Sequence, residues 1–334
     1  MPSRGPHIAA RLEDALHAFR ERRARRRGLV PIVVPFTGYG GPGWVRVLGR
    51  VVMRRPGAAP DRMAGIRGWR SFTSVPVRDA RVVVESGGVR HELTADRGGV
   101  IDQQLGIDLE PGWRELRVST DGDTVAAPVL VIDPGEGFGI VSDVDDTVMV
   151  TALPRPLLAA WNTFVLDEHA RTPVTGMAVL YDRLHRAHQG APIVYLSTGA
   201  WNVAPTLTRF LGRNLFPAGP LLLTDWGPTH DRWFRSGREH KLTNLRRLAT
   251  EFPDVKWLLI GDDGQHDESI YSQFMEEYPD SVAGVAIRRL LPAEAVLAGG
   301  RAGHEPHSED VAPWVSAEDG AGLRDLLGEA GILH

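Results

Sequence analysis

Between residues 138 and 290, short apolar runs alternate with longer stretches in which apolar residues recur at helical spacing. The apolar runs predict strands over residues 138–142, 192–196, 220–224, 256–260 and 282–287. The stretches between them predict helices over residues 155–168, 174–188, 201–212, 240–251 and 268–277. Strands that alternate with helices in this way indicate an α/β fold with a doubly wound parallel sheet. In such sheets, ligands bind beyond the carboxyl ends of the strands.

The preceding region, from about residue 30 to residue 135, has shorter runs in which apolar and polar residues alternate. They predict strands over residues 45–52, 80–85, 89–93, 113–118 and 127–132. Gly, Pro and Asp separate these runs, which is typical of an antiparallel sandwich, and Gly87-Gly88 predicts a hairpin turn. The Gly-rich segment 37–43 lacks the Lys-Ser/Thr pair and the following helix of a phosphate-binding loop, so we expect a plain connection there.

The N-terminal segment predicts a helix over residues 7–27, because Ile8, Leu12, Leu16 and Phe19 recur at helical spacing. Its end is strongly basic, and Gly28 is the expected stop. Two interpretations remain open. A basic amphipathic helix can bind an anionic membrane surface, or the helix docks on the body through Leu12 and Leu16 while its arginines complement the helix dipole.

The C-terminal tail is expected to be loop-like from residue 291 to Trp314, and Ser316-Ala317-Glu318-Asp319 resembles a capping box that starts a last helix. The predicted organisation therefore has four parts. They are a basic amphipathic helix over residues 1–28, a smaller antiparallel β-sandwich-like domain over 29–135, the α/β domain over 136–290, and a tail with a helix over 291–334.

The composition of the chain excludes several classes of protein. A chain of 334 residues with 43% hydrophobic and 24% charged residues is typical of a soluble globular protein of about two domains. The absence of cysteine excludes a disulfide scaffold and a thiolate zinc site. A net charge of −4 argues against general nucleic-acid binding. The sequence contains no apolar run of membrane-spanning length and no signal-peptide core, so we expect a cytoplasmic protein and leave open a peripheral contact with a membrane.

A cluster of carboxylates follows the first predicted strand of the α/β domain. Asp143 and Asp145 stand two residues apart, with Thr147 after them. Two carboxylates held close at the end of a buried strand are costly unless a cation neutralises them, and Mg²⁺ prefers such hard oxygen ligands. The alternative is an ordinary strand-end turn, which Asp and Thr also favour. We expect Asp146 to face solvent.

Polar residues that can bind a phosphate or a metal also follow two further predicted strands. Ser197 follows the strand 192–196, next to Gly199 and ahead of a helix, where a hydroxyl can donate to a phosphate oxygen. Asp262 and Asp263 follow the strand 256–260. Asp267 lies five residues after Asp262, so a loop or first helical turn can bring both carboxylates near a metal.

Lys241 is one of only two lysines in a chain with 38 Lys and Arg residues. A sequence that uses Arg for nearly every positive charge has kept Lys at the start of an amphipathic stretch. The Lys ammonium is a compact charge that can bind a phosphate, and the wider, planar Arg guanidinium is not an equivalent substitute there. The alternative is a lysine that lies on a solvated helix face by chance.

These four pieces, in this order, resemble the haloacid-dehalogenase superfamily of phosphohydrolases over residues 137 to about 290. Residues 176–178, 201–202, 216–220 and 261–265 more narrowly resemble the actin-patch-associated phosphatidate phosphatase catalytic-domain family of eukaryotes, whose members carry a β-rich segment before the catalytic domain. Two departures concern the site. The family commonly has Ser-Asn-Ser-Pro-Trp where residues 197–201 read Ser-Thr-Gly-Ala-Trp, and it commonly has Ser at the position of Asp263. The resemblance therefore predicts the fold and the reaction type of this chain better than it predicts a lipid substrate.

The resemblance implies a role for each catalytic residue. Asp143 is the expected nucleophile, which forms an aspartyl-phosphate. Asp145 is expected to protonate the leaving oxygen and then activate water. Ser197 and Lys241 are expected to hold the phosphoryl oxygens.

The resemblance also implies a magnesium site. Its expected protein ligands are Asp143, Asp262 and the backbone carbonyl of Asp145, and the expected supporting residues are Thr147, Asp263 and Asp267.

The expected function is Mg²⁺-dependent hydrolysis of a phosphomonoester, with a lipid phosphate such as phosphatidate as the leading substrate class. The segments 147–192 and 197–241 leave no room for a large cap domain, and an open site suits a bulky or surface-bound substrate. Two alternatives remain. One is a phosphatase that acts on a soluble metabolite or a nucleic-acid end; the other is a non-enzymatic membrane- or partner-binding module attached to an inactive phosphatase fold.

Overall fold

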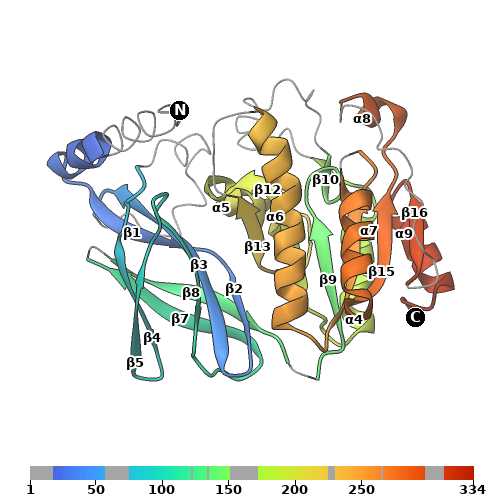
Figure 1. Ribbon diagram of the computed structural model, residues 1–334, viewed down its shortest axis with the longest axis horizontal. Helices are drawn as coiled ribbons and strands as arrows, with labels where there is room; N and C mark the ends of the chain where they lie inside the picture. The colour runs from blue at the N-terminus through green and yellow to red at the C-terminus, as the bar shows by residue number, and fades with distance from the viewer. Residues whose placement is uncertain are drawn as a thin grey trace, which may run out of the picture. The chain divides into compact units, whose positions relative to one another are not determined.

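The computed structural model describes residues 18–56, 75–121, 123–133, 135–150, 172–224, 230–264, 266–297 and 312–334. The chain folds into two compact units (Figure 1). The first comprises residues up to Leu109 together with Trp113–Val129, and the second comprises Glu110–Gly112 together with Leu130–His334. The predicted helix over 155–168 and the predicted helical positions Ile8, Leu12 and Leu16 lie outside the described residues.

The first unit contains an eight-stranded sheet. Its strands are β1 (Val30–Pro35), β2 (Gly38–Gly41), β3 (Trp44–Arg54), β4 (Arg81–Ser86), β5 (Val89–Thr94), β6 (Val100–Leu105), β7 (Gly112–Thr120) and β8 (Asp123–Val131). Their order is β1-β3-β2-β8-β7-β4-β5, with β6 paired to β3. β3 pairs antiparallel with β1, β2 and β6, and β4 pairs antiparallel with β5 and β7. All five strands predicted in this region are present, whereas β1, β2 and β6 were not predicted.

Glycines mark two places in this sheet. The predicted hairpin is confirmed, because Gly87 and Gly88 both have positive φ angles between β4 and β5. The prediction that segment 37–43 is a plain connection was wrong, because Gly38–Gly41 forms strand β2. A Cβ atom at Gly38 would lie 2.4 Å from the carbonyl oxygen of Arg46. Glycine is needed here for close strand pairing.

The second unit contains a six-stranded sheet in the order β13-β12-β9-β14-β15-β16. Its strands are β9 (Phe138–Asp143), β12 (Ile193–Ala200), β13 (Leu221–Thr224), β14 (Lys256–Asp262), β15 (Val282–Arg288) and β16 (Trp314–Ala317). Every pairing in this sheet is parallel. The two short strands β10 (Met149–Val150) and β11 (Thr172–Pro173) form a separate antiparallel pair. The prediction of an α/β fold with a parallel sheet is confirmed.

Helices connect and cover the parallel strands. They are α4 (Met177–Ala187), α5 (Ala204–Arg213), α6 (His230–Glu251), α7 (Asp267–Glu277), α8 (Pro292–Leu297) and α9 (Gly320–Glu329), with the short 3₁₀ turns η3 (Trp201–Val203) and η4 (Pro279–Ser281). In Figure 1, α6 and α7 cover the face toward the viewer, and α4, which contacts α9, lies behind the strands. Among the described residues, no helix combines the length and apolar character that crossing a bilayer requires.

The C-terminal tail differs from its prediction. It contains helix α8 and strand β16, where a loop was expected. The predicted capping box was also wrong. Ser316 pairs with Ile287 in the sheet, and Asp319 caps α9 by accepting hydrogen bonds from the backbone N–H groups of Ala321 and Gly322 at 3.0 and 2.9 Å. Ser316 cannot cap the helix because its backbone belongs to the strand.

The described part of the N-terminal segment is helical over residues 18–26 and turns at residues 27–28. Gly28 has a φ of 74°, which confirms the predicted stop. Phe19 is 56% exposed, whereas Ala24 is buried. Within the described residues, Ala24 therefore lies on the buried side of this helix and Phe19 on its exposed side.

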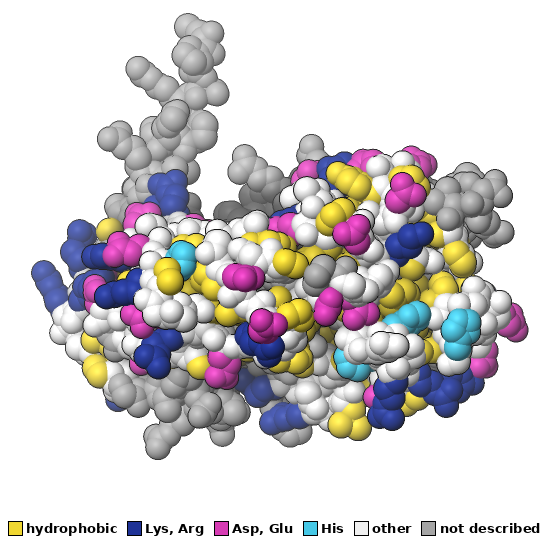
Figure 2. All heavy atoms as spheres, turned by 90° about the horizontal axis from the view of Figure 1, so that it is seen from below, with side chains coloured by type: hydrophobic (Ala, Val, Ile, Leu, Met, Phe, Trp, Pro, Cys, Tyr) yellow, Lys and Arg dark blue, Asp and Glu magenta, His cyan; other side chains and the backbone are white. Residues whose placement is uncertain are grey.

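Charges of both signs lie side by side on the face of the molecule shown in Figure 2. Among the described side chains visible there, basic, acidic and apolar ones are interspersed. This distribution fits the small net charge of −4.

Candidate active site

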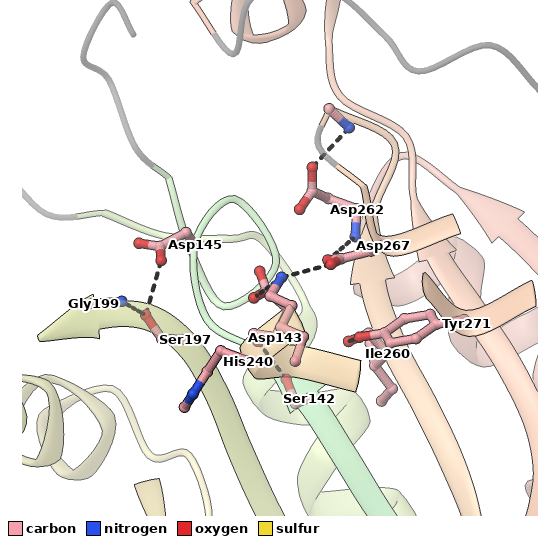
Figure 3. Close-up of polar contacts among 12 residues, drawn as sticks. Ser142, Asp143, Asp145, Ser197, Gly199, His240, Ile260, Asp262, Asp267 and Tyr271 are labelled. Atoms are coloured by element: carbon pink, nitrogen blue, oxygen red, sulfur yellow. Dashed lines mark hydrogen bonds and ion pairs between the residues drawn. The ribbon is translucent and has the colours of Figure 1, made fainter. Parts of the chain in front are cut away.

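The carboxyl ends of three neighbouring strands meet at one edge of the parallel sheet. Asp143 ends β9, Ser197 lies in β12, and Asp262 ends β14. Strand β9 lies between the other two, and Leu196 pairs with Asp143. Figure 3 shows Asp143, Ser197 and Asp262 gathered at this edge. Ile140 and Val141 of β9 are fully buried, so the sheet holds the Asp143 backbone, and Asp143 itself is only 1% exposed.

Lys241 reaches the same edge from helix α6. Its Nζ atom lies 2.6 Å from Asp143 Oδ1 and 2.5 Å from Asp267 Oδ1. The apolar side of α6, formed by Leu242, Leu245 and Leu248, is buried. Lys241 is 3% exposed, so it does not lie on a solvated helix face.

The electrostatic surroundings keep Lys241 charged. Burial lowers the pKa of its ammonium, but the carboxylates of Asp143 and Asp267 outweigh that effect and raise the pKa above its ordinary value. Lys241 is therefore a permanent cation among buried carboxylates.

Three carboxylates form a buried cluster around this cation. Oxygen atoms of Asp143, Asp262 and Asp267 lie within 4.8 Å of one another. Burial, together with the neighbouring carboxylates, raises the pKa of Asp143 and of Asp262 well above the usual range. When all three carboxylates are ionised, one ammonium leaves excess negative charge in this buried cluster.

The cluster fits a divalent cation. Within the described residues, Asp143 Oδ2 and Asp262 Oδ2 are buried and accept no hydrogen bond. Buried carboxylate oxygens without donors are costly, and hard divalent cations prefer ligands of this kind. Asp267, which was expected to play a supporting role, lies within the cluster beside Asp143.

Asp145 and Ser197 form a second pair at the same edge. Ser197 Oγ donates a hydrogen bond to Asp145 Oδ2 at 3.0 Å, and the backbone N–H of Gly199 donates to Ser197 Oγ at 3.0 Å. Figure 3 shows this pair beside Asp143, on the side away from Asp262 and Asp267. The structure therefore separates the side chain of Asp145 from the carboxylate cluster.

The loop after β14 is folded so that Asp267 turns back toward Asp262. The backbone N–H of Gly264 donates to Asp262 Oδ1 at 2.7 Å, and the N–H of Asp262 donates to Asp267 Oδ2 at 3.4 Å. A Cβ atom at Gly261 would lie 2.7 Å from Asp267 Oδ2, so this approach requires glycine. The five-residue spacing thus brings the first turn of α7 onto the strand end.

The remaining predicted residues are buried around the site. Asp263 Oδ1 accepts a hydrogen bond from the backbone N–H of Leu290 at 2.8 Å, and Thr147 is fully buried. The expectation that Asp146 faces solvent was wrong: it is 5% exposed, with a φ of 58°. Its N–H donates to the carbonyl of Met149 at 2.8 Å, because the loop turns back on itself.

Sequence reasoning missed two features of the site. Ser142 Oγ lies 2.6 Å from Tyr181 Oη and donates to the carbonyl of Asp143 at 2.6 Å. Arg288, at the end of β15, is buried and donates to the carbonyl of Asp146 at 2.7 Å. A charged residue at the end of a predicted strand was a visible signal for Arg288. The contact with Tyr181 depends on how α4 packs.

Comparison with known proteins finds a family model that matches this part of the chain. Residues 138–289 match the model of the phosphatidate phosphatase APP1 catalytic domain. Phosphatidate phosphatase APP1 of Saccharomyces cerevisiae is 24% identical over 201 residues, which cover 58% of this chain and 34% of the yeast protein. An uncharacterised protein of Schizosaccharomyces pombe is 25% identical over 181 residues, which cover 53% and 29% of the two chains. The chain thus spans about a third of the length of these curated relatives.

Solved structures add no functional argument. A carbohydrate acetylesterase from Xanthomonas citri superimposes with a TM-score of 0.29 at 12% identity, over 81% of this chain and 73% of that one, which is too loose to compare folds. The family match, in contrast, spans every residue of the site from Asp143 to Arg288. Residues 138–289 are therefore similar to the phosphatidate phosphatase APP1 catalytic-domain family.

Proposed function

We propose that this protein is a Mg²⁺-dependent phosphomonoester hydrolase that forms an aspartyl-phosphate on Asp143. One observation carries the proposal: the buried Lys241 ammonium is held by Asp143 and Asp267, beside Asp262, at the carboxyl edge of the parallel sheet. A phosphate monoester dianion repels a nucleophile until its charge is neutralised. This edge of the sheet combines a carboxylate nucleophile with the positive charge that such a substrate needs.

In the first step, a carboxylate oxygen of Asp143 attacks phosphorus and the bond between phosphorus and the ester oxygen breaks. Asp145, protonated before the step, gives its proton to the departing oxygen. In the free protein, Ser197 donates a hydrogen bond to Asp145 at 3.0 Å, which holds the carboxyl group beside the site until the hydroxyl turns to a phosphoryl oxygen of the substrate.

In the second step, Asp145 takes a proton from a water molecule, whose oxygen attacks the phosphorus of the aspartyl-phosphate. Inorganic phosphate leaves and the carboxylate of Asp143 is restored. The net reaction consumes one water and releases an alcohol and phosphate. Dividing the displacement in this way replaces one difficult step by two easier ones.

Ser197 and Lys241 hold the phosphoryl oxygens in both steps. A divalent cation at this edge would neutralise charge on the phosphoryl group and on the attacking carboxylate. Asp143, Asp262 and the backbone carbonyl of Asp145 would hold it, and the supporting residues are Thr147, Asp263 and Asp267.

We further infer a haloacid-dehalogenase-like, doubly wound fold without a large cap for residues 136–290, and a β-sandwich-like domain for residues 29–135. The strand order of the parallel sheet and the helices on its faces support the first assignment. The antiparallel pairings of the first unit support the second.

The proposed substrate class is a lipid phosphomonoester such as phosphatidate. The family match and the name of the yeast relative support it. The two departures from the family pattern, at residues 197–201 and at Asp263, favour a soluble phosphate ester as the second candidate.

Phosphate release from a panel of lipid and soluble monoesters, with and without detergent micelles, distinguishes the two candidate substrate classes. Activity that requires micelles supports the lipid substrate, whereas faster turnover of a soluble metabolite supports the alternative.

Removing the metal tests the proposed magnesium site. EDTA should abolish hydrolysis of both lipid and soluble esters, and added Mg²⁺ should restore it, because the buried carboxylates otherwise repel the substrate. Asp262→Asn should raise the Mg²⁺ concentration that gives half-maximal activity, since it removes one charged ligand. Hydrolysis that persists in EDTA at the wild-type rate would exclude this site as a catalytic metal centre.

Deleting residues 1–28 tests a peripheral membrane role for the basic N-terminal segment. Six arginines lie between Arg20 and Arg27, and each contributes about 1 kcal/mol near an anionic surface. The deletion should weaken binding to anionic vesicles and lower activity on phosphatidate in those vesicles, while hydrolysis of a small soluble ester continues. Equal loss on both substrates would show that the segment is structural, and failure of the intact chain to bind such vesicles at low salt would remove the membrane role.

A further inference from the structure

Arg288 connects three separate segments at the edge that carries the site. It is the last residue of β15 and is 3% exposed. One terminal nitrogen donates to the carbonyl of Asp146 at 2.7 Å, and the other donates to Glu294 Oε2 at 2.6 Å. Its Nε donates to the carbonyl of Glu318 at 3.3 Å. The guanidinium therefore joins the loop after β9 to helix α8 and to the turn before α9.

The loop that Arg288 contacts has an uncommon backbone conformation. Asp146 has a φ of 58°, in the left-handed region that non-glycine residues seldom adopt. The hydrogen bond from Asp146 N–H to Met149 O closes one side of this turn. The bond from Arg288 to the Asp146 carbonyl ties the same peptide region to the sheet, and a charged donor makes that bond stronger than a neutral one.

The segment after β15 also holds the second carboxylate loop. The backbone N–H of Asp263 donates to the carbonyl of Arg288 at 3.1 Å, and the N–H of Leu290 donates to Asp263 Oδ1 at 2.8 Å. Glu294 is fixed in turn, because its Oε2 atom also accepts from the N–H of Leu291 at 2.9 Å. The loops that carry Asp143 and Asp262 are thus tied to one short stretch of chain.

We propose that Arg288 is a positioning residue for the reaction proposed above, on which this inference rests. It holds the turn at Asp146 so that Asp143 and Asp145, which precede that turn, keep the directions needed for attack and proton transfer. Ser197 and Lys241 come from β12 and α6. Substrate binding therefore depends less on Arg288 than catalysis does.

Arg288→Gln tests the role through kinetics and amide hydrogen exchange. With p-nitrophenyl phosphate as substrate, kcat should fall on the order of 10- to 100-fold, because displacements of about 1 Å at reacting groups cost that much. KM should stay within about threefold of wild type, since the phosphoryl-holding groups are untouched. Exchange measured by mass spectrometry should become faster in peptides that cover residues 144–149, and it should stay unchanged in peptides from the first unit.

Arg246→Gln is the matched control. Arg246 also pairs with a carboxylate, since its Nε and a terminal nitrogen each lie 2.7 Å from an oxygen of Glu277, but this pair joins α6 to α7. Its loss should leave kcat and exchange over residues 144–149 unchanged. Arg288→Lys keeps the charge but cannot reach three segments with one ammonium, so it should restore only part of kcat.

Glu294→Gln provides a second route if Arg288→Gln does not fold. It keeps the size of the side chain, removes the charge that anchors the guanidinium, and should shift kcat and exchange in the same direction by a smaller factor. Wild-type kcat and wild-type exchange in the variants would overturn the proposal. So would faster exchange throughout the parallel sheet with a lower Tm, because that pattern belongs to a purely structural role. If the wild type hydrolyses no phosphate ester, the proposed function fails, while the exchange comparison still decides whether Arg288 holds the loop.

Discussion

Replacing Asp143 by Asn is expected to abolish hydrolysis of phosphate esters, with a loss on the order of 10⁴-fold or more, as for other enzymes that lose a covalent nucleophile. The amide has almost the volume of the carboxyl group but lacks its attacking oxygen and charge. Lys241 still has Asp267 at 2.5 Å, so the buried cation keeps a partner. Steady-state phosphate release measures the loss, and thermal unfolding confirms that the variant is folded.

Two further variants provide a control and a test for the phosphorylated intermediate. Asp182→Asn removes a carboxylate whose partner, Arg186, lies on the exposed side of α4, and it should leave activity unchanged. Asp145→Asn should lose activity on alkyl esters. With p-nitrophenyl phosphate, whose leaving group needs no proton, it should trap phosphate on Asp143, which intact-protein mass spectrometry detects as an acid-stable adduct. An Asp143→Asn enzyme that keeps most of the wild-type rate would reject the covalent mechanism.

Replacing Lys241 by Arg is expected to lower kcat on the order of 10²-fold although the charge is kept, by analogy with the loss of one preorganised donor. The ammonium fits between two carboxylate oxygens at 2.6 and 2.5 Å in a buried position. A guanidinium is wider and planar, so it displaces either a carboxylate or the phosphoryl group. Kinetics on a small soluble ester measures this effect without interference from vesicle binding.

The other lysine of the chain is the natural control. Lys256 is exposed at the start of β14, so Lys256→Arg should have wild-type kcat and wild-type stability. Overpacking at Lys241 also destabilises by about 1–3 kcal/mol, so Tm should fall for Lys241→Arg alone. If Lys241→Arg works as well as the wild type, Lys241 does not contact the phosphoryl group and its rarity in the sequence is accidental.

The fold of the second unit was predictable wherever a strand is fully buried. Runs such as residues 192–196 and 257–260 are apolar throughout because helices cover both faces of a parallel sheet, and their lengths then separate them from helices. Strand β16 was not predictable in this way. It lies at the edge of the sheet, and its residues Trp314–Ala317 are only partly buried apart from Ala317. Its identity depends on pairing with β15, which is distant in sequence from it.

The first unit also contains a strand that the sequence did not predict, for a different reason. Strand β2 reads as a Gly-rich loop, since glycine is ordinarily depleted in strands. Its glycines are explained only by the carbonyl groups of β3, which approach too closely for a Cβ atom at Gly38 or Gly40. Neither helix propensity nor the alternation of apolar and polar residues predicts such close contacts between strands.

The sequence by itself determined which side chains gather at the candidate site. Asp143, Ser197 and Asp262 each follow an apolar run, and the carboxyl ends of parallel strands necessarily meet at one edge. Only the tertiary structure decided how these side chains are paired: Lys241 with Asp143 and Asp267, Ser197 with Asp145, and Arg288 with the Asp146 turn. The positions of the strand ends follow from a pattern repeated along the chain, whereas a pairing depends on where a helix packs and which way a loop turns. Those are set by contacts between residues as far apart as Asp146 and Arg288, and no local pattern encodes them.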